Sequence, residues 1–133
     1  MLNPDDVARV AAECVRQARE FFVIDPAWKV YLKLGQLQGD ARALITITAD
    51  YLYASITVDP MASDDLAEVW GDVGHEVAHL VLADLENTRA FIEQDEAHGS
   101  MSPLDRSFRQ GVERAVVRLE RLWLRERPYQ PES

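Results

Sequence analysis

The chain has 133 residues, 47% of them hydrophobic and 28% charged, which fits one globular domain spanning residues 1–133. Its net charge of −9 disfavours binding to nucleic-acid phosphates and to anionic membrane surfaces. The single cysteine, Cys14, excludes an internal disulfide. The acidic first residues lack the apolar core of a signal peptide, and no stretch reaches the roughly 18 apolar residues of a membrane span. We therefore expect a cytoplasmic protein without nucleic-acid or membrane partners.

Apolar residues at spacings of three and four predict a first helix. Asn3 is its expected N-cap and Pro4 its first residue, and Asp25-Pro26 is expected to stop it. Three strand candidates follow at residues 28–34, 41–49 and 51–58. Short connections favour antiparallel pairing. The expected fold class is therefore α+β, with a small antiparallel sheet of about three strands.

A second helix is expected after Ser63, its predicted N-cap, and is expected to run to about residue 84. Gly71 and Gly74 interrupt its apolar stripe, and each costs up to about 1 kcal/mol relative to alanine in a helix. Close packing against a neighbour would explain them. A weaker helical pattern covers residues 87–96, and a strong one runs from about residue 103 to 127 before Pro128.

The run His75-Glu76-Val77-Ala78-His79 lies inside the second helix. Histidines four residues apart on a helix share one face, so two imidazole nitrogens can reach one zinc ion. Glu76 lies about 100° around the helix from His75. There it can accept a proton from a metal-activated water, which then attacks a peptide carbonyl. The pattern predicts a Zn²⁺ site at His75 and His79 with Glu76 as the catalytic base.

A catalytic zinc usually has three protein ligands, so a third is expected downstream. A histidine six residues after His79 is excluded, because Leu85 stands there. Glu113 is favoured because it borders the apolar stripe of the last helix, where a side chain can turn inward. Glu120 and Glu93 are the backups, and the remaining candidates are Asp95, Glu96 and His98.

Together these runs resemble small zincin-like metallopeptidases of the gluzincin and minigluzincin type, including short proteins encoded by phages and prophages. The matching segments are residues 28–34, 51–58, 75–80 and 112–119. The resemblance implies a helix, a small sheet, an active-site helix and a glutamate helix. It implies zinc held by His75, His79 and Glu113, and Glu76 as general base. It also implies a location in the host cytoplasm, if the protein is encoded by a phage.

The resemblance further suggests that an edge strand, residues 51–58, pairs with an extended peptide beside the metal. Larger gluzincins often carry an acidic residue four positions after the ligand glutamate, but Val117 stands there in this chain. The oxyanion stabiliser is unassigned, and His98, Tyr53 and Tyr129 are its candidates.

The expected function is zinc-dependent hydrolysis of a peptide or protein substrate. Two alternatives remain open at this point. The first is a zinc-binding module of zincin type that binds a protein partner and hydrolyses nothing. The second is a metal-free interaction module.

Overall fold

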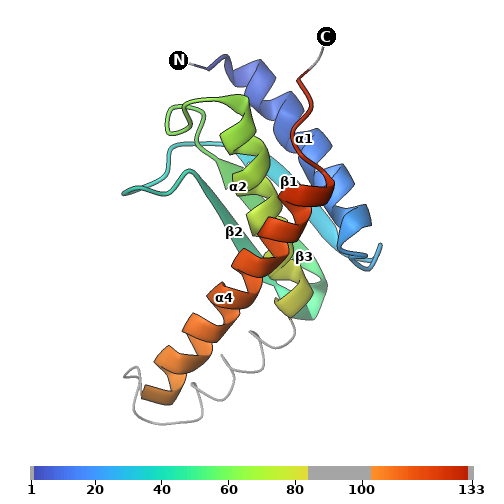
Figure 1. Cartoon of the computed structure of the whole chain (residues 1–133), viewed down its shortest axis with the longest axis vertical. Helices are drawn as coiled ribbons and strands as arrows, with labels where there is room; N and C mark the ends of the chain where they lie inside the picture. The colour runs from blue at the N-terminus through green and yellow to red at the C-terminus, as the bar shows by residue number, and fades with distance from the viewer. Residues whose placement is uncertain (1, 84–102, 132–133) are drawn as a thin grey trace.

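The architecture combines three helices with a small sheet, as a computed structural model that describes residues 2–83 and 103–131 shows (Figure 1). In chain order the elements are α1 (Pro4–Phe21), β1 (Lys29–Leu34), β2 (Ala43–Thr48), the 3-10 turn η1 (Ala49–Tyr51), β3 (Tyr53–Val58), α2 (Leu66–Ala78), the 3-10 turn η2 (His79–Leu82) and α4 (Pro103–Glu126). The α+β class is therefore confirmed. The helical pattern at residues 87–96 lies outside the described residues.

Helix α1 begins as its sequence predicts. The Asn3 side chain accepts a hydrogen bond from the backbone N–H of Asp5 at 2.8 Å, and Pro4 is the first helical residue. The helix ends at Phe21, before the expected stop at Asp25-Pro26, and Val23 then adopts a positive φ of 53°. This left-handed residue turns the chain out of the helix and toward the sheet.

The sheet differs from the expected antiparallel arrangement. Its strand order is β1-β3-β2, with β1 parallel to β3 and β2 antiparallel to β3. The expectation is therefore wrong for β1. The segment 35–42 carries the chain past one strand position, and β3 returns into that space. The alternate residues Ala54, Ile56 and Val58 of β3 are buried, which suits a central strand under two helices.

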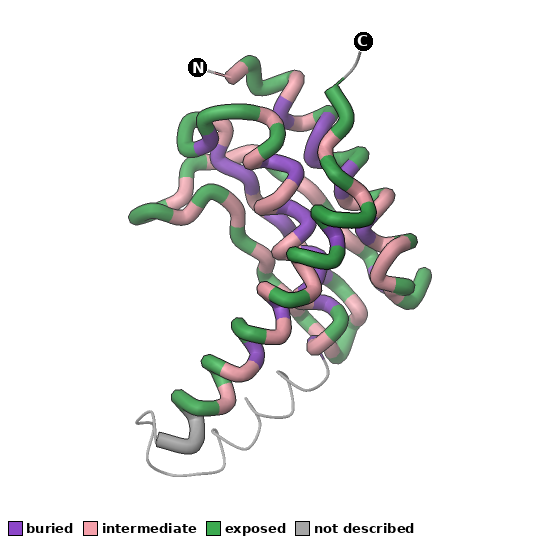
Figure 2. The backbone as a smooth tube through the Cα atoms, viewed as in Figure 1, coloured by how far each residue is buried: buried purple, intermediate pink, exposed green. Residues whose placement is uncertain are grey.

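One face of the sheet carries the helices. Helices α1 and α2 contact each other and the sheet, and α4 packs on α2 (Figure 1). The buried residues gather between these layers (Figure 2), while Tyr31 and Tyr53 lie on the opposite, exposed face of the sheet. None of the described helices is both long enough and apolar enough to cross a membrane.

Helix α2 begins two residues later than expected. Its N-cap is Asp65, which accepts from the backbone N–H of Glu68 at 2.8 Å, while Glu68 accepts from the N–H of Asp64 at 2.9 Å. These two hydrogen bonds satisfy the N–H of Glu68 in the first turn and the N–H of Asp64 just before the N-cap. The expectation of Ser63 as N-cap is wrong, and Ser63 is buried instead. At its other end the helix tightens into η2 at His79.

Cys14 provides a test of the packing of α1 against α2. Its side chain is fully buried, its Sγ donates to the carbonyl of Trp70 at 3.2 Å, and burial raises the pKa of the thiol. Because the thiolate is the nucleophile, we expect no alkylation of the native protein by iodoacetamide at pH 8 and full alkylation in urea. Mass spectrometry measures both. Rapid labelling of the native protein would contradict the position of α1 against α2.

Candidate metal centre

Helix α2 and the start of η2 present the two histidines side by side. The ring centroids of His75 and His79 lie 5.3 Å apart, with an angle of 67° between the ring planes. Their side chains are 22% and 13% exposed, so both rings are mostly buried yet reachable from solvent. The chain changes to 3-10 geometry at His79. Both rings nevertheless lie on one side of the helix.

Helix α4 brings Glu113 to these rings. One carboxylate oxygen of Glu113 lies 3.3 Å from Nε2 of His79, and the other lies 3.7 Å from Nε2 of His75. One atom from each residue falls within 4.8 Å of the others, and the Glu113 side chain is 57% exposed. Ligand atoms of a tetrahedral zinc site lie about 3.3 Å from one another at usual bond lengths. Two imidazoles and one carboxylate at these distances form a group that could hold a metal ion.

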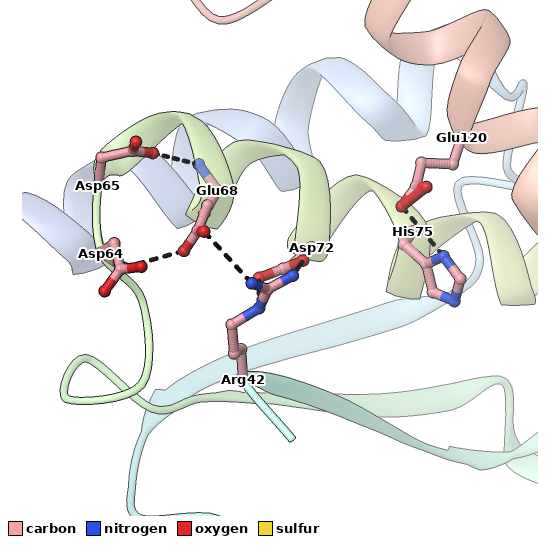
Figure 3. A network of polar contacts seen from close by, with 7 residues as sticks. All are labelled: Arg42, Asp64, Asp65, Glu68, Asp72, His75 and Glu120. Carbon is pink, nitrogen blue, oxygen red and sulfur yellow. Dashed lines mark hydrogen bonds and ion pairs between the residues drawn. The ribbon is translucent and has the colours of Figure 1, made fainter. Parts of the chain in front are cut away.

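Glu120 lies on the other side of the His75 ring. Its carboxylate is 3.2 Å from Nδ1 of His75 (Figure 3). A carboxylate only accepts, so Nδ1 carries the hydrogen, and the lone pair of a neutral imidazole then lies on Nε2, the nitrogen nearer Glu113. This hydrogen bond raises the pKa of His75, while burial lowers it. Glu120 therefore orients a candidate ligand, a role that differs from the ligand role considered for it.

Val117 stands four residues after Glu113, where no carboxylate is available, but Glu120 lies about one turn further along α4. Glu120 follows Glu113 by seven residues, which is about two helical turns, so both carboxylates lie on the same side of α4. A carboxylate two turns after Glu113 thus contacts one of the two histidines. Such partners fix the tautomer and ring orientation of metal-binding histidines.

Glu76 is not part of the group of possible ligands in the described residues. Burial raises the pKa of Glu76, whereas His79, His75 and a hydrogen bond from the backbone of Ile45 lower it. A carboxylate with a raised pKa beside two imidazoles suits the transfer of a proton. The contact with Ile45 also shows that strand β2 lies next to this side chain.

A second polar network ties the start of β2 to α2, and the sequence analysis missed it. The Arg42 guanidinium contacts Asp72 through two nitrogens at 3.0 and 2.9 Å and Glu68 at 3.3 Å (Figure 3). Burial raises the pKa of Asp72, and Arg42 counters this shift. Asp72 lies one turn before His75 and Glu76 on α2. The position of Asp72 one turn before the histidine was visible in the sequence, but its pairing with Arg42, thirty residues away, was not.

A cavity of about 330 Å³ adjoins Glu76. Its lining residues come from the start of β2, from α2 and from α4, and they are Asp40, Arg42, Ala43, Asp72, His75, Glu76 and Glu120. Strand β2 pairs only with β3 among the described strands, so β2 is the edge strand beside this cavity. The expected edge strand at residues 51–58 is wrong, because β3 is central and paired on both sides.

Two of the candidates for the oxyanion stabiliser, Tyr53 and Tyr129, lie away from the site. Tyr53 lies on the sheet face away from α2, with its ring 5.1 Å from that of Tyr31. Tyr129 packs its ring 6.0 Å from that of Trp70, on the side of α1. His98 lies outside the described residues, as do the ligand candidates Glu93, Asp95 and Glu96.

Compared with known proteins, the chain matches no protein-family model, no curated protein and no solved structure. The likeness to zincins therefore depends on the residues and geometry described above, and its functional meaning is a proposal.

Replacement of Glu120 tests the second carboxylate. Glu120→Gln keeps the side-chain shape but replaces the charged acceptor for Nδ1 of His75 with a neutral amide, so we expect zinc affinity to fall by about 10–100-fold. Competition with a chromogenic chelator measures the affinity. The matched control is Glu126→Gln, which changes an exposed carboxylate of the same helix that contacts Arg125. Equal affinities in the two variants would contradict the orienting role of Glu120.

Replacement of Arg42 tests the contact between β2 and α2. Arg42→Ala leaves the half-buried Asp72 carboxylate without its cation, and we expect a loss of about 1 kcal/mol, the upper end for a partly exposed pair. We also expect faster amide exchange at the start of β2. Urea unfolding and hydrogen-exchange mass spectrometry measure these effects. Arg16→Ala, which removes exposed pairs with Glu13 and Glu20 on α1, is the control, and no change in β2 exchange is expected there.

Proposed function

We propose that this protein is a zinc-dependent peptidase of the zincin type, with His75, His79 and Glu113 as metal ligands and Glu76 as the general base. One observation carries the proposal. The Glu113 carboxylate reaches from a distant helix to the Nε2 atoms of two histidines that lie one turn apart. The glutamate between those histidines stays outside the ligand group and beside a cavity.

When bound in such a site, zinc polarises a carbonyl and lowers the pKa of a water molecule toward about 7. The residues of the chain supply the remaining functions. Glu76 accepts a proton from a water molecule as the oxygen of that water attacks the carbonyl carbon, and it delivers the proton to the amine when the C–N bond breaks. Burial favours the protonated form of Glu76, and the neighbouring histidines favour the ionised form. The burial of Glu76 and its neighbouring histidines thus act on its pKa in opposite directions.

The substrate that suits this arrangement is an extended peptide. Strand β2 is an edge strand, and a peptide that adds to its free edge gains main-chain hydrogen bonds. Its backbone at Ile45 lies near Glu76, so a peptide on this edge has its carbonyl groups close to the general base. The adjoining cavity of about 330 Å³ has room for a side chain of that peptide.

Replacement of the general base tests the proposal. We expect Glu76→Gln to retain zinc, because Glu76 is not a ligand, and to lose at least about 100-fold in hydrolysis, the usual contribution of a general base. Glu113→Gln is the complementary variant and should lose zinc itself. Elemental analysis measures the metal, and mass spectrometry of a mixed peptide library measures cleavage. Full activity of Glu76→Gln would overturn the mechanism.

The same measurements separate the alternative functions. A wild-type protein that binds zinc tightly and cleaves no peptide would instead be a zinc-stabilised binding module. A wild-type protein without zinc affinity would overturn the metal centre altogether.

A further inference from the structure

Helices α2 and α4 approach each other closely at Gly74 and Trp123. A Cβ atom built on Gly74 would lie 2.5 Å from Cδ1 of the Trp123 indole and closer still to its Nε1. Carbon atoms in van der Waals contact normally lie about 3.5–4.0 Å apart. Any side chain at position 74 would therefore force the two helices apart or expel the indole. The close packing predicted for this glycine is confirmed.

The indole of Trp123 is enclosed by other aromatic rings, so it cannot easily move away from position 74. Trp123 is fully buried, its ring stacks on Trp70 at 5.2 Å, and the ring of Phe21 meets it edge-on at 5.6 Å. Phe22 lies at 6.2 Å. The aromatic rings of α1 and α2 thus hold Trp123 in place over Gly74. A methyl group at position 74 would be accommodated by movement of α4 more readily than by rotation of the indole.

This contact lies directly beside the candidate metal centre. Gly74 precedes His75, and Trp123 follows Glu120 by three residues, so the contact is within one turn of the 3.2 Å bond between His75 and Glu120. Glu113 lies ten residues before Trp123, about 15 Å along the same helix. A displacement of α4 at Trp123 would therefore move both carboxylates relative to the histidines.

The other glycine of α2 behaves differently. A Cβ atom on Gly71 would meet the Leu124 side chain at 3.8 Å, which is an ordinary contact. Both glycines weaken the helix by a similar amount relative to alanine, but only Gly74 is required by a neighbour. Further along the same face, Ala78 packs with Val112 and Val116 of α4. The small residues Gly74 and Ala78 thus allow α4 to pack closely on α2 from Val112 to Trp123.

We propose that Gly74 is a positioning residue of the metal centre. By admitting the indole of Trp123, it sets the spacing of α2 and α4 at which Glu113 reaches both histidines and Glu120 reaches His75. This inference rests on the proposed zinc site and adds to it a residue that is neither a metal ligand nor the general base.

The experiment compares Gly74→Ala with Gly71→Ala, a matched control three residues earlier on the same helix. Zinc affinity is measured by chelator competition, and the fold by circular dichroism and urea unfolding. Gly71→Ala should keep wild-type affinity. Gly74→Ala should remain helical and bind zinc at least about tenfold more weakly, the size of effect expected when ligand support is disturbed. A folded Gly74→Ala protein with wild-type zinc affinity would overturn the proposal.

A second pair of variants decides the question if Gly74→Ala does not fold. Trp123→Leu removes the indole atoms that the new methyl group would meet, and Gly74→Ala is then added to it. Equal and measurable zinc affinity of folded Trp123→Leu and the double variant supports the proposal, because the methyl group matters only when the indole is present. A further tenfold loss in the double variant overturns it. If wild-type protein bound no zinc, the proposed function would fail as well, whereas every other outcome concerns Gly74 alone.

Discussion

The packing of helix α4 on helix α2 is the interaction on which the rest of this molecule depends. Its centre is Trp123, which stacks on Trp70 and covers Gly74. Truncation of a buried tryptophan typically costs about 3–5 kcal/mol, so this contact is a large part of the stability of a small domain. The same helix carries Glu113 and Glu120, so the packing that stabilises the fold also brings two carboxylates to the histidines of α2.

Three carboxylates lie around the His75 ring. Glu76, Glu113 and Glu120 all surround His75, and each of them raises its pKa. Glu113 in turn raises the pKa of Glu76. Carboxylates gathered in this way repel one another, and a bound divalent cation is often the largest charge that offsets such repulsion. The net charge of −9 thus includes carboxylates assembled at one site as well as solvated helix faces.

The mixed sheet forms the side of the site opposite helix α4. Because β3 takes the central position, β2 becomes the edge strand that faces Glu76 and the cavity beside it. The Arg42 contacts with Asp72 and Glu68 join the start of this strand to the helix that carries the histidines. Strand β2 and helix α2 are therefore joined at one end by the ion pairs of Arg42. Further along, they are joined by the hydrogen bond between the Ile45 backbone and Glu76.

Local patterns along the chain were sufficient to predict helices α1, α2 and α4, the three strand segments and the shared helix face of His75 and His79. Those features follow from periodicity and capping, which act over a few residues. They also favoured Glu113 among several carboxylates, because its place at the border of the apolar stripe is a local property. Strand order, the ion pairs of Arg42 and the role of Glu120 were decided by tertiary structure alone. Each depends on which distant segments meet, and a three-stranded order or a contact across 45 residues leaves no periodic trace in one sequence.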